Sequence, residues 1–196
     1  LRGGDSGRGI DLTGRSNVTI TSIEVAFFSY GIYLDRSSCI SIYECDISQN
    51  SGYAIVLKDS SGNGIYHNEI YTNGNGIYLV NSLNNNISGN HIANNADGID
   101  LIGSSNNRIS GNYIANRWMG INLDASLNNS ITENEINNNF AGVYLTQTCS
   151  GNVIYHNNFL RNTWRQAYSE KSVNIWDNGY PSGGNYWSDY TGTDTN

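Results

Sequence analysis

The chain repeats itself every 22 or 23 residues. Each copy begins with a small residue, and these are Gly9, Gly31, Ala54, Gly76, Gly98, Gly120 and Gly142. A branched apolar residue follows directly, and a leucine stands two positions further on in every copy, at Leu12, Leu34, Leu57, Leu79, Leu101, Leu123 and Leu145. Internal repeats of this length predict a solenoid, because one such unit buries its apolar residues only by stacking on its neighbours.

The repeating unit is built of strands. Gly, Asn and Ser fill every copy, which disfavours a helix, and the apolar positions alternate with a period of two. Three short strands and three turns fit one unit and form one rung of a parallel β-helix. We therefore predict an all-β fold, a single-stranded right-handed parallel β-helix (solenoid) of about seven 22-residue rungs, roughly 35 Å long. Residues 1–163 are assigned to the β-helix and 164–196 to an aromatic-rich C-terminal capping segment of the same domain.

Asparagine recurs at one fixed position of the repeat. The members of this column are Asn68, Asn90, Asn112, Asn134 and Asn157. Stacked carboxamides donate to one neighbour and accept from the other, whereas an unpaired buried amide costs about 1–3 kcal/mol. The column therefore predicts a structural ladder, with Ile23 and Cys45 at the same position in the first rungs. A second column is predicted at Asn50, Asn73, Asn95, Arg117, Asn139 and Asn162.

Composition excludes several classes of protein. The net charge is −7 with few Lys and Arg, which argues against nucleic acid or anionic membrane as a partner. No stretch approaches the 18 apolar residues that a spanning segment needs. Since the chain begins at Leu1, we expect a mature or excised piece of a longer protein. No disulfide is expected, because Cys39 and Cys45 would lie about 20 Å apart along one extended strand and Cys149 would lie five rungs away.

Two stretches carry a resemblance to known proteins. The first is NNNISGNHIANNADGI, from Asn84 to Ile99, and the second is IWDNGYPSGGNYWSDYTGTD, residues 175–194. The chain resembles parallel β-helix repeat proteins of the NosD-like and carbohydrate-binding or sugar-hydrolase group. Its tail is similar to the closing segment of cell-surface proteins of methanogenic archaea. The resemblance covers residues 9–194 and implies the fold and an extracellular or cell-surface location, but not one activity, because such repeats are scaffold.

One outer face of the rod carries the candidate site. Residues beside the repeated leucine point outward, which brings aromatic, amide and carboxyl side chains together over about four rungs. Trp118 belongs to Arg117-Trp118-Met119, the sharpest departure from the repeat. Rings that stack on sugars beside groups that hydrogen-bond hydroxyls are typical of saccharide recognition. The predicted saccharide-binding residues are Tyr78, Asp100, Trp118, Asn122, Asp124 and Tyr144.

Catalysis on this face is the alternative. Asp100 and Asp124 would serve as an acid–base pair for glycoside cleavage, or Arg117 as the base of a lyase. The Gly-His-Gly segment of β-helix galacturonidases and the Arg-x-Pro-x-x-Arg type of motif of pectate lyases are both absent from the sequence. We therefore expect a module that binds polysaccharide or cell-envelope glycan without cleaving it. A structural module that assembles end to end through its N-terminal rung, or that continues into upstream rungs there, is the third hypothesis.

The sequence predicts no cofactor. The NosD resemblance raises copper, but the potential ligands are only Met119, His67, His91 and His156. His67 and His156 would lie four rungs apart, ~19 Å, which is too far for one ion. Calcium is left open, because Asp97, Asp100 and Asp124 offer oxygen ligands. Asn-x-Ser/Thr sites for glycosylation occur at Asn17, Asn86 and Asn128.

Overall fold

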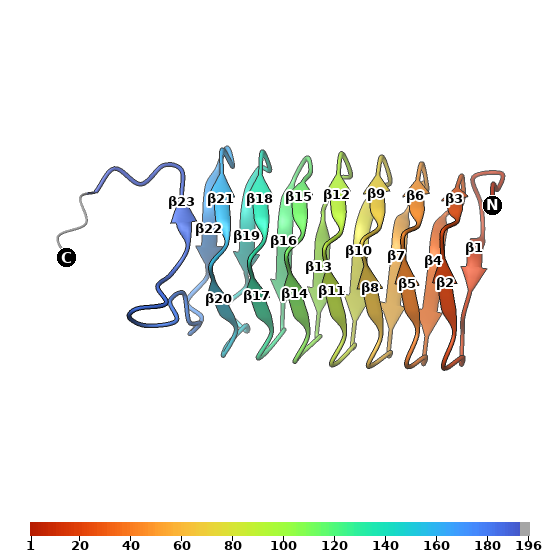
Figure 1. Cartoon of the computed structure of the whole chain (residues 1–196), viewed down its shortest axis with the longest axis horizontal. Coiled ribbons are helices and arrows are strands. Elements are labelled where there is room, and N and C mark those ends of the chain that lie inside the picture. The colour runs from red at the N-terminus through yellow and green to blue at the C-terminus, as the bar shows by residue number, and fades with distance from the viewer. Residues whose placement is uncertain (193–196) are drawn as a thin grey trace.

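The protein is a rod of stacked coils. The computed structural model describes residues 1–192, and every strand pairing among them is parallel. The rungs follow one another along a single long axis, with β1 and β23 at opposite ends of the rod (Figure 1). The predicted all-β parallel β-helix is thus confirmed. Since the described residues form no helix, none of them belongs to a helix long and apolar enough to cross a membrane.

Three parallel sheets run the length of the rod. Sheet 1 contains β1 (Arg8–Asp11), β4 (Tyr30–Asp35), β7 (Tyr53–Lys58), β10 (Asn75–Val80), β13 (Ile99–Ile102), β16 (Met119–Asp124), β19 (Ala141–Leu145) and β22 (Arg165–Ser169). Sheet 2 contains β2 (Thr19–Thr21), β5 (Ser41–Tyr43), β8 (Gly64–Tyr66), β11 (Asn86–Ser88), β14 (Arg108–Ser110), β17 (Ser130–Thr132) and β20 (Val153–Tyr155). Sheet 3 contains β3 (Glu24–Ala26), β6 (Asp46–Ser48), β9 (Glu69–Tyr71), β12 (His91–Ala93), β15 (Tyr113–Ala115), β18 (Glu135–Asn137), β21 (Asn158–Leu160) and β23 (Tyr186–Trp187).

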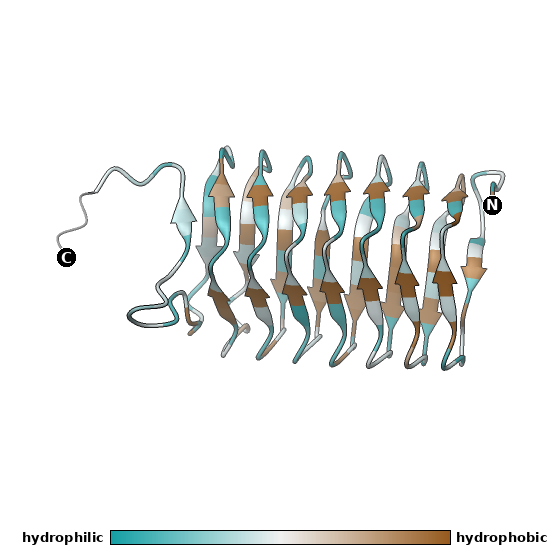
Figure 2. Cartoon of the chain, viewed as in Figure 1, coloured by the Kyte–Doolittle hydropathy of each residue, from teal (hydrophilic) through white to brown (hydrophobic). Residues whose placement is uncertain are grey.

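The core consists of columns of identical apolar side chains. Ile77 is in register with Ile99, and Leu79 with Leu101, and all four are fully buried. The same hydrophobic positions recur in successive rungs in Figure 2. Burying one such side chain contributes roughly 1.5–3 kcal/mol. The fold therefore does not depend on cross-links, and the three cysteines are free thiols.

The first asparagine ladder forms as predicted. Asn112 Nδ2 donates to Asn134 Oδ1 over 2.9 Å, and Asn112 Oδ1 accepts from the backbone N–H of Asn90, also over 2.9 Å. The same bonds run from Asn68 to Asn157 and on to Asn185. In the first rungs the buried Cys45 takes this position. Each ladder amide thus holds the turn of the rung before it.

Two further ladders were not predicted, and both lie in the turns between sheets 1 and 2. One is made of asparagines, and its members are Asn63, Asn85, Asn107, Asn129, Asn152 and Asn174. The other is made of serines, and its members are Ser37, Ser60, Ser82, Ser104 and Ser126. From Ser60 onward, each hydroxyl oxygen of the serine ladder accepts the backbone N–H of the preceding member. Polar side chains thus satisfy the buried backbone groups of these turns.

The second predicted column is wrong at one member. Asn116, not Arg117, accepts from Asn95 Nδ2 over 2.9 Å and continues to Asn139, while the Arg117 side chain is exposed. The physical reason is that this corner between sheets 3 and 1 is divided differently, with one residue fewer before the ladder amide and one more after it. Other rungs place one residue with positive φ directly before the ladder amide, and these residues are Gln49, Thr72, Asn94, Asn138 and Arg161. The rung of Asn116 has no such residue, so its ladder amide comes one position early.

The rung pattern continues beyond residue 163. Strand β22 pairs with β19, and β23 pairs with β21. The Trp187 ring stacks on Phe159, with 4.6 Å between ring centroids and 6° between planes. Trp176 lies 6.1 Å from Trp187. These rings cover the apolar end of the last rung.

Candidate functional site

Four of the predicted site residues form one column on the outer face of sheet 1. Tyr78, Asp100, Asn122 and Tyr144 are in register on β10, β13, β16 and β19. Asp124 lies on the same face, two residues further along β16 than Asn122. Parallel pairing without a register shift places these side chains at successive strand spacings of about 4.8 Å.

Asp100 lies at the centre of this column and is only 6% exposed. Asn122 Nδ2 donates to its Oδ1 over 3.3 Å, and Asn75 Nδ2 donates to its Oδ2 over 3.2 Å. Burial raises the pKa of Asp100 to about 7, and the negative charge of Asp97 adds to this rise, which the two amides only partly offset. No cation pairs with Asp100 among residues 1–192. This carboxyl group therefore exchanges its proton near neutral pH.

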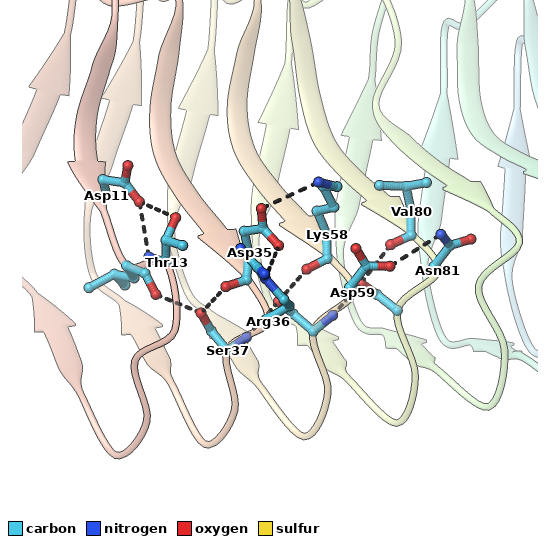
Figure 3. Close-up of polar contacts among 12 residues, drawn as sticks. Asp11, Thr13, Asp35, Arg36, Ser37, Lys58, Asp59, Val80 and Asn81 are labelled. Carbon is cyan, nitrogen blue, oxygen red and sulfur yellow. Dashed lines mark hydrogen bonds and ion pairs between the residues drawn. The ribbon is translucent and has the colours of Figure 1, made fainter.

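Carboxylates at the N-terminal end of the same face have the opposite environment (Figure 3). Hydrogen bonds from Thr13 and Arg8 lower the pKa of Asp11 to about 2. Asp35 lies between two cationic side chains, with Lys58 Nζ at 3.3 Å. One sheet thus holds carboxyl groups beside cationic side chains at one end and a carboxyl group without a cationic partner in the middle. Such divergence is typical of functional carboxyl groups.

Asp124 has its own partner. Its Oδ1 accepts a hydrogen bond from Thr146 Oγ1 over 2.8 Å, and no hydrogen bond within residues 1–192 joins it to Asp100. The carboxylate that acts on Asp100 is Asp97, whose Oδ1 accepts the backbone N–H of Met119 over 2.9 Å. Sequence reasoning placed Asp97 only among calcium ligands, although its position directly before Gly98 puts it beside the same strand.

Trp118 begins a group of aromatic rings at the corner between sheets 3 and 1. It is 55% exposed, and its centroid lies 5.9 Å from Phe140 in an edge-to-face arrangement. Phe140 stacks on Trp164 at 5.5 Å, and Trp164 lies 5.5 Å from Tyr168 and 6.4 Å from Tyr144. We call these five residues the aromatic ridge. Sequence reasoning missed Phe140, although it stands two residues before Gly142 just as Trp118 stands two before Gly120.

Tyrosines flank Asp100 on the other side. Tyr53 lies 4.8 Å from Tyr78, and Tyr30 stacks on Tyr53 at 6.1 Å. Neither Tyr30 nor Tyr53 was predicted. Asp100 and Asn122 consequently occupy a polar gap between a tyrosine group and the aromatic ridge. Carboxyl and amide groups between aromatic rings are suited to bind hydroxyl-rich, partly apolar rings.

Arg117 does not join the two predicted catalytic aspartates. It lines a separate pocket of about 600 Å³, together with residues of sheet 3 such as Tyr113. Phe140 borders this pocket as well, so the pocket and the aromatic ridge meet at that ring. The structure therefore divides the predicted residues between two neighbouring surfaces.

The three predicted glycosylation sites differ in accessibility. Asn17 and Asn128 are exposed and have positive φ angles of 56° and 54°. Asn86 is half-buried in β11, and its Oδ1 is buried without a hydrogen-bond partner. Glycosylation of all three stays a prediction, with Asn17 and Asn128 the better placed.

Comparison with known proteins decides the family. A family model described as "Periplasmic copper-binding protein (NosD)" matches residues 2–192. The chain belongs to the NosD family. Membership agrees with the resemblance seen in the repeats and the tail, and it covers the described rungs of the rod. No curated protein matches this NosD-family chain.

Solved structures with the same fold include sugar-active proteins. A double mutant of the periplasmic alginate epimerase AlgG is 26% identical with a TM-score of 0.70, and the match covers 86% of this chain and 46% of the epimerase chain. The Dettilon tailspike protein is 19% identical with a TM-score of 0.67, covering 83% and 38%. The DFA-IIIase from Arthrobacter chlorophenolicus A6, in complex with GF2, is 14% identical with a TM-score of 0.61, covering 70% and 40%. The chain spans less than half the length of these structures, and the last two show the fold alone.

The residues present do not fit copper, which the NosD name implies. His91 Nδ1 lies 2.6 Å from Glu69, and His156 Nε2 lies 2.8 Å from the backbone oxygen of Ser182. His67 belongs to a rung four steps from that of His156. Residues 1–192 contain no group of three or more His, Cys, Asp or Glu side chains arranged to hold a metal ion. Calcium at Asp97, Asp100 or Asp124 stays a prediction.

Proposed function

We propose that this chain binds polysaccharide along the outer face of sheet 1 without cleaving it. The observation that carries the proposal is the polar gap at Asp100 and Asn122 between two groups of aromatic rings. Exposed rings stack on the apolar faces of sugar rings, while carboxyl and amide groups bind their hydroxyls. The flat, extended face follows the rod over several rungs, which suits a polymer better than a small ligand.

The relatives support the ligand class and the location. The epimerase with the same fold is named for alginate, a polysaccharide, and is described as periplasmic. The NosD family is also described as periplasmic. We therefore assign the chain to the cell envelope or the extracellular space, with a polysaccharide or envelope glycan as partner. Tailspike and DFA-IIIase relatives are too distant to carry more than the fold.

Trp118→Ala tests the binding face. Trp118 is 55% exposed and contacts only the edge of the ridge, so its removal should leave the melting temperature unchanged. Loss of one stacking ring should weaken polysaccharide affinity about tenfold, equivalent to roughly 1.4 kcal/mol. Affinity is measured against a panel of neutral and acidic polysaccharides. Tyr180→Ala, which removes a ring that is 97% exposed in the C-terminal segment, is the matched control. Equal affinity of wild type and Trp118→Ala would remove Trp118 from the site.

Size-exclusion chromatography of the same mixtures separates binding from cleavage. Unshortened polymer that co-elutes with the protein is the expected result. Shortened polymer would make the chain an enzyme, and the buried Asp100 with its pKa of about 7 and its neighbour Asp97 would then be the acid–base candidate. Loss of shortening in Asp100→Asn would assign that role. An end-to-end structural module predicts instead that light scattering shows growing particles as protein concentration rises, and a strict monomer counts against it.

A further inference from the structure

A pocket lies on the sheet 3 side of the rod, at the corner where Asn116 joins the ladder one position early. In neighbouring rungs the residues Asn94 and Asn138 bulge outward at this corner with φ angles of 59° and 54°. The rung between them has no residue with positive φ at the equivalent position. Both asparagines and Asn116 line the pocket of about 600 Å³. The departure from the repeat at this rung thus coincides with a pocket that the turns of both neighbouring rungs also line.

Small side chains deepen the pocket. Ala93 and Ala115 line it, at a position of sheet 3 where the preceding rung has Tyr71. Rings form its sides: Tyr113 lies 4.9 Å from His91 on one side, and Phe140 lies on the other. A pocket of this volume is within the range of small-ligand sites. It offers amides, aromatic rings and one cation.

The cation is Arg117. Its guanidinium makes no ion pair and no hydrogen bond among residues 1–192, in a chain whose net charge is −7. The carboxylates of Glu69 and Glu135 on sheet 3 do not line the pocket. Glu69 is paired with His91, and Glu135 accepts a hydrogen bond from Asn137 Nδ2 over 3.2 Å. An arginine without an acidic partner, beside amides and rings, is suited to a carboxylate ligand that it binds with two parallel hydrogen bonds.

We propose that this corner pocket binds a carboxylated sugar unit, a uronate, with Arg117 on the carboxylate and Asn94 and Asn138 on hydroxyls. The inference rests on the proposed function, because it takes the ligand to be a saccharide. It adds the chemical class: the polymer is acidic. Phe140 belongs to both surfaces, so one chain bound in the pocket continues over this ring onto the aromatic ridge.

Calorimetric titration with trimers of galacturonate and mannuronate, and with their methyl esters, tests the proposal. The ester removes the charge and keeps the sugar. Wild type should bind at least one acid trimer ten times or more tightly than its ester, and Arg117→Gln should abolish that preference without shifting the melting temperature. Arg108→Gln is the control, because Arg108 is an exposed arginine on β14 of sheet 2. This variant should keep the preference.

The outcomes separate the two proposals. Equal affinity of wild type for acid and ester, or an unchanged preference in Arg117→Gln, overturns the uronate pocket while leaving the binding face intact. If neither acid trimer binds to wild type, the uronate pocket is also overturned. Neutral polymers that bind wild type and lose affinity only in Trp118→Ala support the face alone. Loss of preference in Arg108→Gln as well would show a general charge effect and would likewise overturn the pocket.

Discussion

Replacing Asn112 by leucine should lower the free energy of unfolding by about 1–3 kcal/mol. Asn112 is 1% exposed and donates to Asn134 Oδ1, to Ile87 O and to Ser110 O, while its Oδ1 accepts from both the backbone and the side chain of Asn90. Leucine of similar volume makes none of these bonds. At least the backbone N–H of Asn90 would be left buried and unpaired, at about 1–3 kcal/mol, and the backbone oxygens of Ile87 and Ser110 would lose their side-chain donor.

Denaturant unfolding of wild type and Asn112→Leu measures this loss. Asn158→Leu is the matched control, because Asn158 lies exposed on β21 and its side chain makes no hydrogen bond among the described residues. The control should change stability by less than about 0.5 kcal/mol. If both variants unfold at the same denaturant concentration as wild type, the amide ladder does not stabilise the rod.

The first ladder was predictable because strictly spaced apolar residues fix the alignment around it. Asn90, for example, stands between Ile87 and Ile92, and every rung repeats that spacing. The ladder that contains Asn85 is equally regular in the sequence, two residues before Ile87. It was missed because asparagine beside turn residues suggests a solvated turn. Only the path of the backbone shows that this amide points inward.

The corner at Arg117 shows where fixed spacing fails. The rung is one residue short before its ladder amide and one longer after it, so the total length is unchanged and the alignment shows no gap. Counted from Ile114, the ladder position could fall on Asn116 or on Arg117. The residue type was the better guide, because asparagine can join the ladder and a charged arginine cannot be buried there without a partner.

The sequence predicted the central column of the candidate face but not the side chains that surround it. Tyr78, Asp100, Asn122 and Tyr144 were placed in one column because strand register follows from the repeat. The aromatic ridge was found only at Trp118. The coupling of Asp100 to Asp97 was missed, since electrostatic coupling depends on burial and distance and not on the spacing of residues in the sequence.

Asp100→Asn should stabilise the protein at pH 8 and not at pH 4. Burial raises the folded-state pKa of Asp100 from 3.8 to about 7. Between these values the folded chain holds a proton that the unfolded chain has released, so stability falls as pH rises from 4 to 7. Ionised Asp100 therefore costs the folded state up to about 4 kcal/mol at pH 8. Asparagine resembles the protonated acid and cannot ionise, so it removes this cost.

Melting curves between pH 4 and pH 8 measure the effect, and Asp11→Asn is a control of opposite sign. Hydrogen bonds lower the folded-state pKa of Asp11 to about 2, so its contribution to stability is lost only as pH falls from about 4 to 2. Asp11→Asn should therefore not stabilise at pH 8. If Asp100→Asn also fails to do so, the Asp100 carboxylate is better solvated than its 6% exposure indicates.

Stabilisation by Asp100→Asn would also bear on function. Asn122 occupies the same column one rung later, so an amide fits this outer face of sheet 1. A carboxyl group that destabilises the fold at neutral pH, where an amide would fit, has no structural advantage at that position. Its advantage must then lie in what it binds or protonates. A variant that is more stable at pH 8 and also loses polysaccharide binding or cleavage would place Asp100 in the site, whereas a more stable variant with unchanged binding and no lost activity would leave the aromatic rings as the binding determinants.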